Sequence, residues 1–179
     1  MRIFREWVLA IALYVALVLD GSLAFYLHQF QNWHGYGASC WLMPIGIILI
    51  ALFDDMNDKE IWLALGAGVV ADIYNFGIVG VYTVFFPLAC WCCQKIARFL
   101  PETFWARLII VLLGLTLLDA FVWLILNMVG LISTSLRTLL ISLALNLVWS
   151  LIFFCLSYAV WANLSTRYPF LVDLEAYRQ

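Results

Sequence analysis

The sequence predicts an all-α integral membrane protein, folded as a compact bundle of six transmembrane helices in a single domain over residues 1–179. Apolar residues make up 66% of the chain and charged residues only 11%, whereas soluble domains are about 45–50% apolar and about 25% charged. The mean hydropathy of +1.03 also excludes an ordinary soluble domain. In addition, the apolar residues fall into separate stretches whose lengths approach the roughly 20 residues of a membrane-spanning helix.

The expected spans are residues 7–27, 38–53, 61–76, 78–94, 108–132 and 138–162. The first apolar run continues through Leu27 with Asp20 inside it, so we expect a retained span rather than a signal peptide. The second is short unless residues 33–37 form its interfacial entry, and Pro44 is tolerated near its first turns. The fifth and sixth are long and uninterrupted.

The third and fourth spans are separated only by Asn75, Phe76 and Gly77. The third is roughly 24 Å long as a helix, short of the roughly 30 Å hydrocarbon core of a bilayer. We therefore expect a tight glycine hairpin at this break, or a thinned end that other parts of the protein cover.

The positive charges predict that both termini are cytoplasmic. Short cytoplasmic loops are enriched in Lys and Arg. With the N-terminus inside, every Lys and Arg except Arg137 falls on the inner side: Arg2, Arg5, Lys59, Lys95, Arg98, Arg107, Arg167 and Arg178. A five-span arrangement would put the cations of one half on the wrong side. The outer loops are then short, so contacts with soluble partners are expected on the cytoplasmic side.

Three carboxylates, Asp20, Asp72 and Asp119, lie inside apolar stretches, where an ionisable side chain is costly and is therefore a candidate functional group. Because no Lys, Arg or His lies at matching depth, we expect these acids to be protonated or hydrogen-bonded to hydroxyls and amides. A structural role in capping and bridging helices is favoured over a proton or cation path.

Small and polar residues accompany the acids at helical spacing. The stripes are Ala12, Ala16, Asp20 and Ala24; Ala64, Gly68, Asp72 and Asn75; Thr116, Asp119, Trp123 and Asn127; and Ser142, Asn146, Ser150 and Ser157. Such faces are expected to point at other helices, which predicts a polar-lined interior. Asp72 lies one turn before the break at Asn75, so its carboxylate is expected to accept from backbone N–H groups left open at the turn.

No catalytic, cofactor-binding or metal site is expected. Neither His28 nor His34 has a Cys or Glu at ligand spacing, and the sequence contains neither a nucleophile elbow nor a phosphate-binding glycine-rich loop. The acidic segment 54–60 lacks the glycine and spacing of an EF-hand. A net charge of −2 without a block of cations excludes nucleic acid as a partner.

The string of Cys90, Cys92 and Cys93 lacks the four ligands of a structural zinc site, so these cysteines are expected to pack within a membrane helix. Further roles for this string and for the acidic segment 54–60 stay open.

Residues 66–83, GAGVVADIYNFGIVGVYT, form a recognisable pattern. This stretch resembles the central signature of the bacterial rod shape-determining protein MreD family, in which a glycine-containing helix ends in Asp and is followed by Gly-x-x-Gly and another helix. Physically, Gly68 allows close helix approach, whereas Gly77 and Gly80 permit backbone geometry that other residues resist. Size, span count and cytoplasmic termini also resemble that family.

The resemblance implies a non-enzymatic subunit of the cell-elongation machinery in the bacterial cytoplasmic membrane. It implies binding to the bitopic protein MreC. It also implies a link between cytoplasmic MreB filaments and the peptidoglycan synthase RodA with its penicillin-binding transpeptidase. Helix contacts within the lipid bilayer would be the mechanism, and no cofactor is implied.

An alternative is the substrate-binding membrane subunit of an energy-coupling-type transporter for small solutes or vitamins, which is also a compact six-helix protein. Its polar interior would be the substrate pocket, although short outer loops make a poor lid. An enzyme acting on lipid-linked substrates is disfavoured because the cations are scattered along the chain.

Overall fold

The structure of the chain, a computed structural model, describes residues 7–54 and 56–170 except for 32–39. These residues form the helices α2 (Val8–Gln31), α3 (Leu42–Phe53), α4 (Lys59–Asn75), α5 (Tyr82–Ala97), α6 (Phe104–Met128) and α7 (Leu136–Arg167). The described part of the chain contains no strand, so the predicted all-α class is confirmed.

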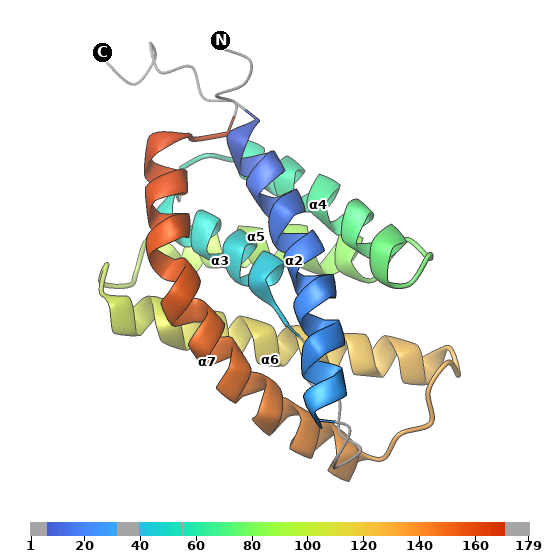
Figure 1. Ribbon diagram of the computed structural model, residues 1–179. Coiled ribbons are helices and arrows are strands. Elements are labelled where there is room, and N and C mark those ends of the chain that lie inside the picture. The colour runs from blue at the N-terminus through green and yellow to red at the C-terminus, as the bar shows by residue number, and fades with distance from the viewer. Residues whose placement is uncertain (1–6, 32–39, 55, 171–179) are drawn as a thin grey trace, which may run out of the picture.

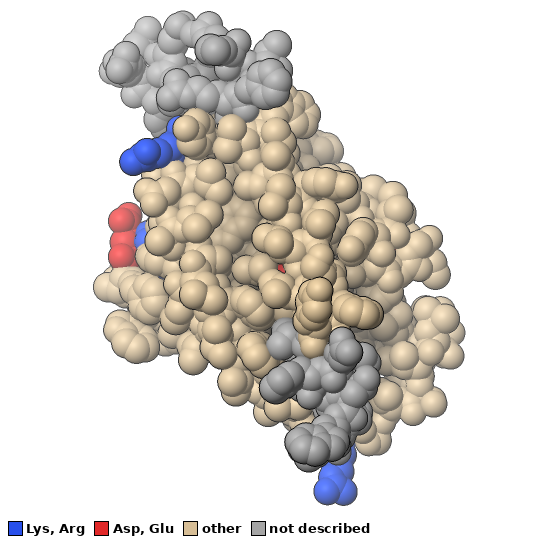
Figure 2. Space-filling view, viewed as in Figure 1, with Lys and Arg blue, Asp and Glu red and all other residues tan. Residues whose placement is uncertain are grey.

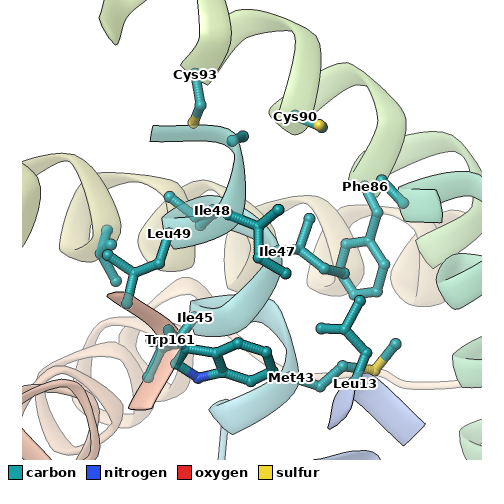
Figure 3. Packing of buried hydrophobic residues seen from close by; sticks show 14 of the residues in the cluster. Leu13, Met43, Ile45, Ile47, Ile48, Leu49, Phe86, Cys90, Cys93 and Trp161 are labelled. Atoms are coloured by element: carbon teal, nitrogen blue, oxygen red, sulfur yellow. The ribbon is translucent and has the colours of Figure 1, made fainter. Parts of the chain in front are cut away.

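Helix α3 lies at the centre of the molecule, with α2 and α7 in front of it and α5 and α6 behind it (Figure 1). All of its residues from 43 to 52 are buried, because the helix is apolar on every side and each side meets a neighbour. Figure 3 shows the side chains of α3 among Leu13 of α2, Phe86 of α5 and Trp161 of α7. At Gly46 the absence of a side chain lets the Trp161 ring lie against the α3 backbone.

Helices α4 and α5 form the most extensively packed pair in the structure. A Cβ atom at Gly68 would lie 2.7 Å from both Thr83 Cα and the Tyr82 carbonyl oxygen, so only glycine permits this approach. In the connecting segment Gly77 and Gly80 have φ angles of +68° and +141°, a conformation that side chains oppose. Helix α5 therefore begins at Tyr82, later than the expected start at Ile78.

Three helical segments are long and apolar enough to cross a membrane: Val8–Tyr26 within α2, Phe104–Met128 and Leu136–Arg167. Helices α3, α4 and α5 have 12, 17 and 16 residues and are shorter than a full span. The face in Figure 2 is covered by uncharged side chains, with charges near its edges. The chain is thus a membrane protein, and six spans and cytoplasmic termini remain predictions.

Other helix boundaries also differ from the expected spans. Helix α6 begins and ends earlier than the range 108–132, because Gly130 adopts a φ of +78° after its last turn. Helix α7 extends beyond residue 162 to Arg167. Helix α3 begins at Leu42, and residues 38 and 39 of its expected span lie outside the described residues.

One end of the molecule, here named the Trp7 end, brings together residues from distant parts of the chain. The rings of Trp7 and Phe170 are 5.9 Å apart between centroids. Asn57 Nδ2 donates to the Phe170 carbonyl oxygen at 3.0 Å, and Gln94 Nε2 donates to the Asn57 carbonyl oxygen at 3.0 Å. The acidic segment 54–60 is therefore tied to α5 and to the residues that follow α7.

Replacing Gly68 by Ala is expected to lower the free energy of unfolding by about 1–3 kcal/mol, because the added methyl group pushes α4 away from the α5 backbone. The apparent unfolding temperature of the detergent-solubilised protein measures this loss. Gly66→Ala is the matched control, since a Cβ atom at Gly66 meets nothing within 4 Å. Equal losses in the two variants would contradict the close packing at Gly68.

Candidate functional site

The carboxylate of Asp72 forms the densest hydrogen-bond cluster at the α4–α5 hairpin. Its Oδ1 accepts from the backbone N–H of Tyr82 at 2.7 Å. Its Oδ2 accepts from the backbone N–H groups of Gly80 and Thr83 at 2.8 and 3.0 Å, and from the Thr83 hydroxyl at 2.7 Å. Asp72 has no exposed surface, so these four donors replace the water that an exposed carboxylate would bind.

The need for this cluster follows from the way α5 begins. Val81 precedes the helix and supplies no side-chain cap, so the N–H groups of Tyr82 and Thr83 lack acceptors within the helix. A negative charge at a helix N-terminus is also favoured by the helix dipole. Asp72 on α4 therefore caps α5 from the preceding helix, and its hydrogen bonds fix the hairpin.

Asp20 on α2 has the same relationship to α3. Its Oδ1 accepts from the backbone N–H of Leu42 at 2.7 Å, and its Oδ2 accepts from that of Met43 at 2.8 Å. Trp41, which precedes α3, supplies no side-chain cap. Asp20 is 7% exposed, so α2 carries a nearly buried acid whose partners are the first N–H groups of α3.

Asp119 on α6 makes a different contact with the helix that follows it. Its Oδ2 accepts from Asn146 Nδ2 of α7 at 3.0 Å, well inside both helices. Asn146, Ser150 and Ser157 lie along the buried face of α7, as expected for the polar stripe on the sixth span. The bond between Asp119 and Asn146 joins α6 to α7 near the middle of their lengths.

The remaining site candidates lie near the ends of helices. Asn75 occupies the last position of α4, where its Nδ2 donates to the Ala71 carbonyl oxygen at 2.9 Å. Asn127 lies in the last turn of α6, and its carbonyl oxygen accepts from the N–H of Gly130 at 3.2 Å. These asparagines are local to their own helix ends and do not join the three carboxylates.

The sequence did not single out two residues of α5 that the structure places among the acids. Thr83 supplies both a hydroxyl and an N–H to Asp72. Tyr82 is buried and lies within electrostatic reach of Asp20, Asp72 and Asp119. The position of Tyr82 immediately after the Gly-x-x-Gly turn is the available signal, because the first residue of a helix lies nearest to its cap.

A separate buried acid, Glu60, lies at the Trp7 end. It is only 2% exposed, and its two carboxylate oxygens have no hydrogen-bond partner among the described residues. Glu60 precedes the expected third span, in the first turn of α4. Burial and the nearby Asp54 carboxylate raise the pKa of Glu60 from 4.5 to about 10, against a smaller opposing effect of the Gln94 amide. The side chain is therefore neutral at physiological pH.

The described residues contain no group of three or more His, Cys, Asp and Glu side chains that could hold a metal ion. The five cysteines are free thiols. Cys90 and Cys93 face the apolar core beside α3 (Figure 3), whereas Cys92 is exposed on the outer side of α5.

Replacing Asp72 by Leu is expected to lower the free energy of unfolding by at least about 3 kcal/mol, because several backbone N–H groups lose their acceptor inside the protein. The folded yield and the apparent unfolding temperature in detergent measure this loss. Asp58→Leu, at an exposed loop position, is the matched control and should change the free energy by about 0.5 kcal/mol or less. An Asp72→Leu protein with normal yield and unfolding temperature would contradict the capping role.

The raised pKa of Glu60 predicts that stability falls as pH rises. Above pH 4.5 the unfolded chain releases the Glu60 proton, whereas the folded chain keeps it until about pH 10. The free energy of unfolding should therefore decrease with rising pH in this window, by up to about 1.4 kcal/mol per pH unit. Unfolding temperatures at several pH values for wild type, Glu60→Gln and the exposed control Glu102→Gln test this. Glu60→Gln should flatten the slope, and an unchanged slope would refute the prediction.

The chain was compared with known proteins. The family model described as rod shape-determining protein MreD matches residues 1–160, which include the α4–α5 hairpin and its Asp72 cluster. No curated protein and no solved structure gives a match. The family match covers most of the chain and agrees with the resemblance in residues 66–83. The chain therefore belongs to the MreD family of rod shape-determining membrane proteins.

Proposed function

We propose that the chain is a non-enzymatic scaffold subunit of the bacterial cell-elongation complex in the cytoplasmic membrane. In this role it binds MreC and helps to couple peptidoglycan synthesis by RodA and its penicillin-binding transpeptidase to MreB filaments. The family match over residues 1–160 carries this proposal. The proposal includes six membrane-crossing helices with the Trp7 end in the cytoplasm, which the distribution of Lys and Arg supports.

A groove between α2 and α4 offers a surface for a partner helix. Its volume is about 430 Å³, and its lining is almost wholly apolar. Ala10 of α2 and Gly66 and Ala67 of α4 lie in it, and small residues of this kind let a second helix approach closely within a bilayer. At the Trp7 end the groove is bordered by Trp7 and Trp62, whose rings are largely exposed.

We assign this groove to the single membrane helix of MreC. A bitopic partner offers one apolar helix in the bilayer, and a groove lined with small residues increases the van der Waals contact that drives helix association there. Gly66 is central to the assignment because nothing within this chain occupies the space where its Cβ would lie. A larger side chain at Gly66 would therefore fill the groove without disturbing the fold.

Replacing Gly66 by Leu is expected to reduce the recovery of MreC about tenfold when the tagged chain and MreC are produced together and purified in detergent. Ala159→Leu is the matched control, since it adds the same side chain to an exposed position of α7. Both variants should keep the wild-type unfolding temperature. Full recovery of MreC with Gly66→Leu would place the binding surface elsewhere, and no recovery with wild type would refute the scaffold proposal.

The second candidate function remains the substrate-binding subunit of an energy-coupling-type transporter. The observation that favours it is a partly polar cavity of about 340 Å³ inside the bundle. Purification from the native membrane separates the two candidates. A stoichiometric ATPase module in place of MreC and the synthase pair would support the transporter.

A further inference from the structure

The cavity inside the bundle lies among residues of α2, α3, α4, α5 and α6 and has a volume of about 340 Å³. This volume is at the small end of the range of about 300–1,000 Å³ in which ligand sites are found. The lining includes the carboxylates of Asp20 and Asp119 and the side chains of Trp41, Asn75 and Tyr82. In Figure 2 a small acidic surface is visible between apolar side chains in the middle of the face shown.

The two carboxylates of this cavity differ in how much hydrogen bonding they already have. Both oxygens of Asp20 accept backbone N–H groups at the start of α3. The bond that the described residues supply to Asp119 reaches only its Oδ2, from Asn146. Helix α7 does not need Asp119 as a cap, because the Ser135 side chain accepts from the Thr138 N–H. Asp119 therefore keeps acceptor capacity on the cavity side.

The lining residues include no Lys, Arg or His that could balance these acids. A buried carboxylate without a cation is costly, and a positively charged ligand would lower that cost. The charge arrangement of the cavity thus selects for a cation and against an anion.

Aromatic rings form another wall of the same cavity. Tyr82 stacks between Phe76 and Phe86, with ring centroids 5.5 and 5.2 Å apart, and Trp41 meets Tyr82 edge-on at 6.4 Å. The Trp41 Nε1 atom is buried and has no hydrogen-bond partner among the described residues. Aromatic faces next to carboxylates are the surroundings that bind organic ammonium groups, through cation–π attraction and charge.

We propose that this cavity binds a small organic ammonium ion, with Asp119 as the counter-charge and Trp41 and Tyr82 as the aromatic wall. The apolar remainder of the lining, from Leu17, Met43 and Val122, contacts the alkyl part of the ligand. An inorganic cation satisfies the charge but leaves this apolar surface without contacts. The inference does not depend on the scaffold role, because the cavity lies inside the bundle and the groove for MreC lies outside it.

Titration of the full-length protein in detergent with choline tests this inference. Choline should bind and raise the unfolding temperature with concentration, whereas its neutral isostere 3,3-dimethylbutan-1-ol should not. Asp119→Asn should weaken choline binding about tenfold, and the exposed Asp58→Asn should leave it unchanged. Calorimetric titration gives the affinities, and gel filtration checks the folding of each variant.

Three outcomes would overturn the inference. They are absence of choline binding at millimolar concentration, equal binding of the neutral isostere, and equal affinity of wild type and Asp119→Asn. If Asp119→Asn fails to fold, Trp41→Phe takes its place, since it removes only the unpartnered N–H and the larger ring. Unchanged choline affinity in Trp41→Phe would then contradict the aromatic wall, and the comparison with the isostere in wild type decides on the charge. Neither result affects MreC recovery.

Discussion

A backbone N–H inside an apolar bundle needs an acceptor, and the first turn of a helix is where acceptors within the chain run out. Helices α3 and α5 begin after Trp41 and Val81, neither of which offers a capping side chain. Asp20 and Asp72 supply the acceptors from the helices that precede them. Each donor left unpaired would cost about 1–3 kcal/mol. The placement of the two helices, and of every residue packed on them, therefore depends on these two acids.

The three acids follow one plan with a single variation. Each lies on the first helix of a consecutive pair, α2–α3, α4–α5 or α6–α7, and contacts the second helix of that pair. In the third pair Ser135 caps α7 locally, so Asp119 reaches a side chain farther along α7. A membrane bundle with few cations can thus hold several carboxylates, because the backbone and amide groups of the next helix supply the donors. In the absence of buried basic residues at the same depth, hydrogen bonding does what ion pairing would do elsewhere.

The sequence was most informative where the interacting residues are close along the chain. Asp72 lies one turn before a glycine-containing break, so its hydrogen bonding at that turn could be predicted. The partners of Asp20 are 22 and 23 residues away, and nothing local identifies them. Hydropathy marked the apolar runs but not their caps, which is why α5 begins later than expected. Segment 54–60 has the composition of a solvated loop, and only its contacts with α5 and Phe170 explain the burial of Glu60.

The enclosed position of α3 has a consequence for how the chain enters the membrane. With 12 residues, α3 is about 18 Å long and does not cross a hydrocarbon core of about 30 Å unaided. It is covered by helices made before it and by α5, α6 and α7, which are made after it. Asp20 also enters with α2 before the start of α3 has been synthesised. Insertion of the first two helices is therefore provisional, and the last helix of the chain completes the surroundings that keep α3 in place.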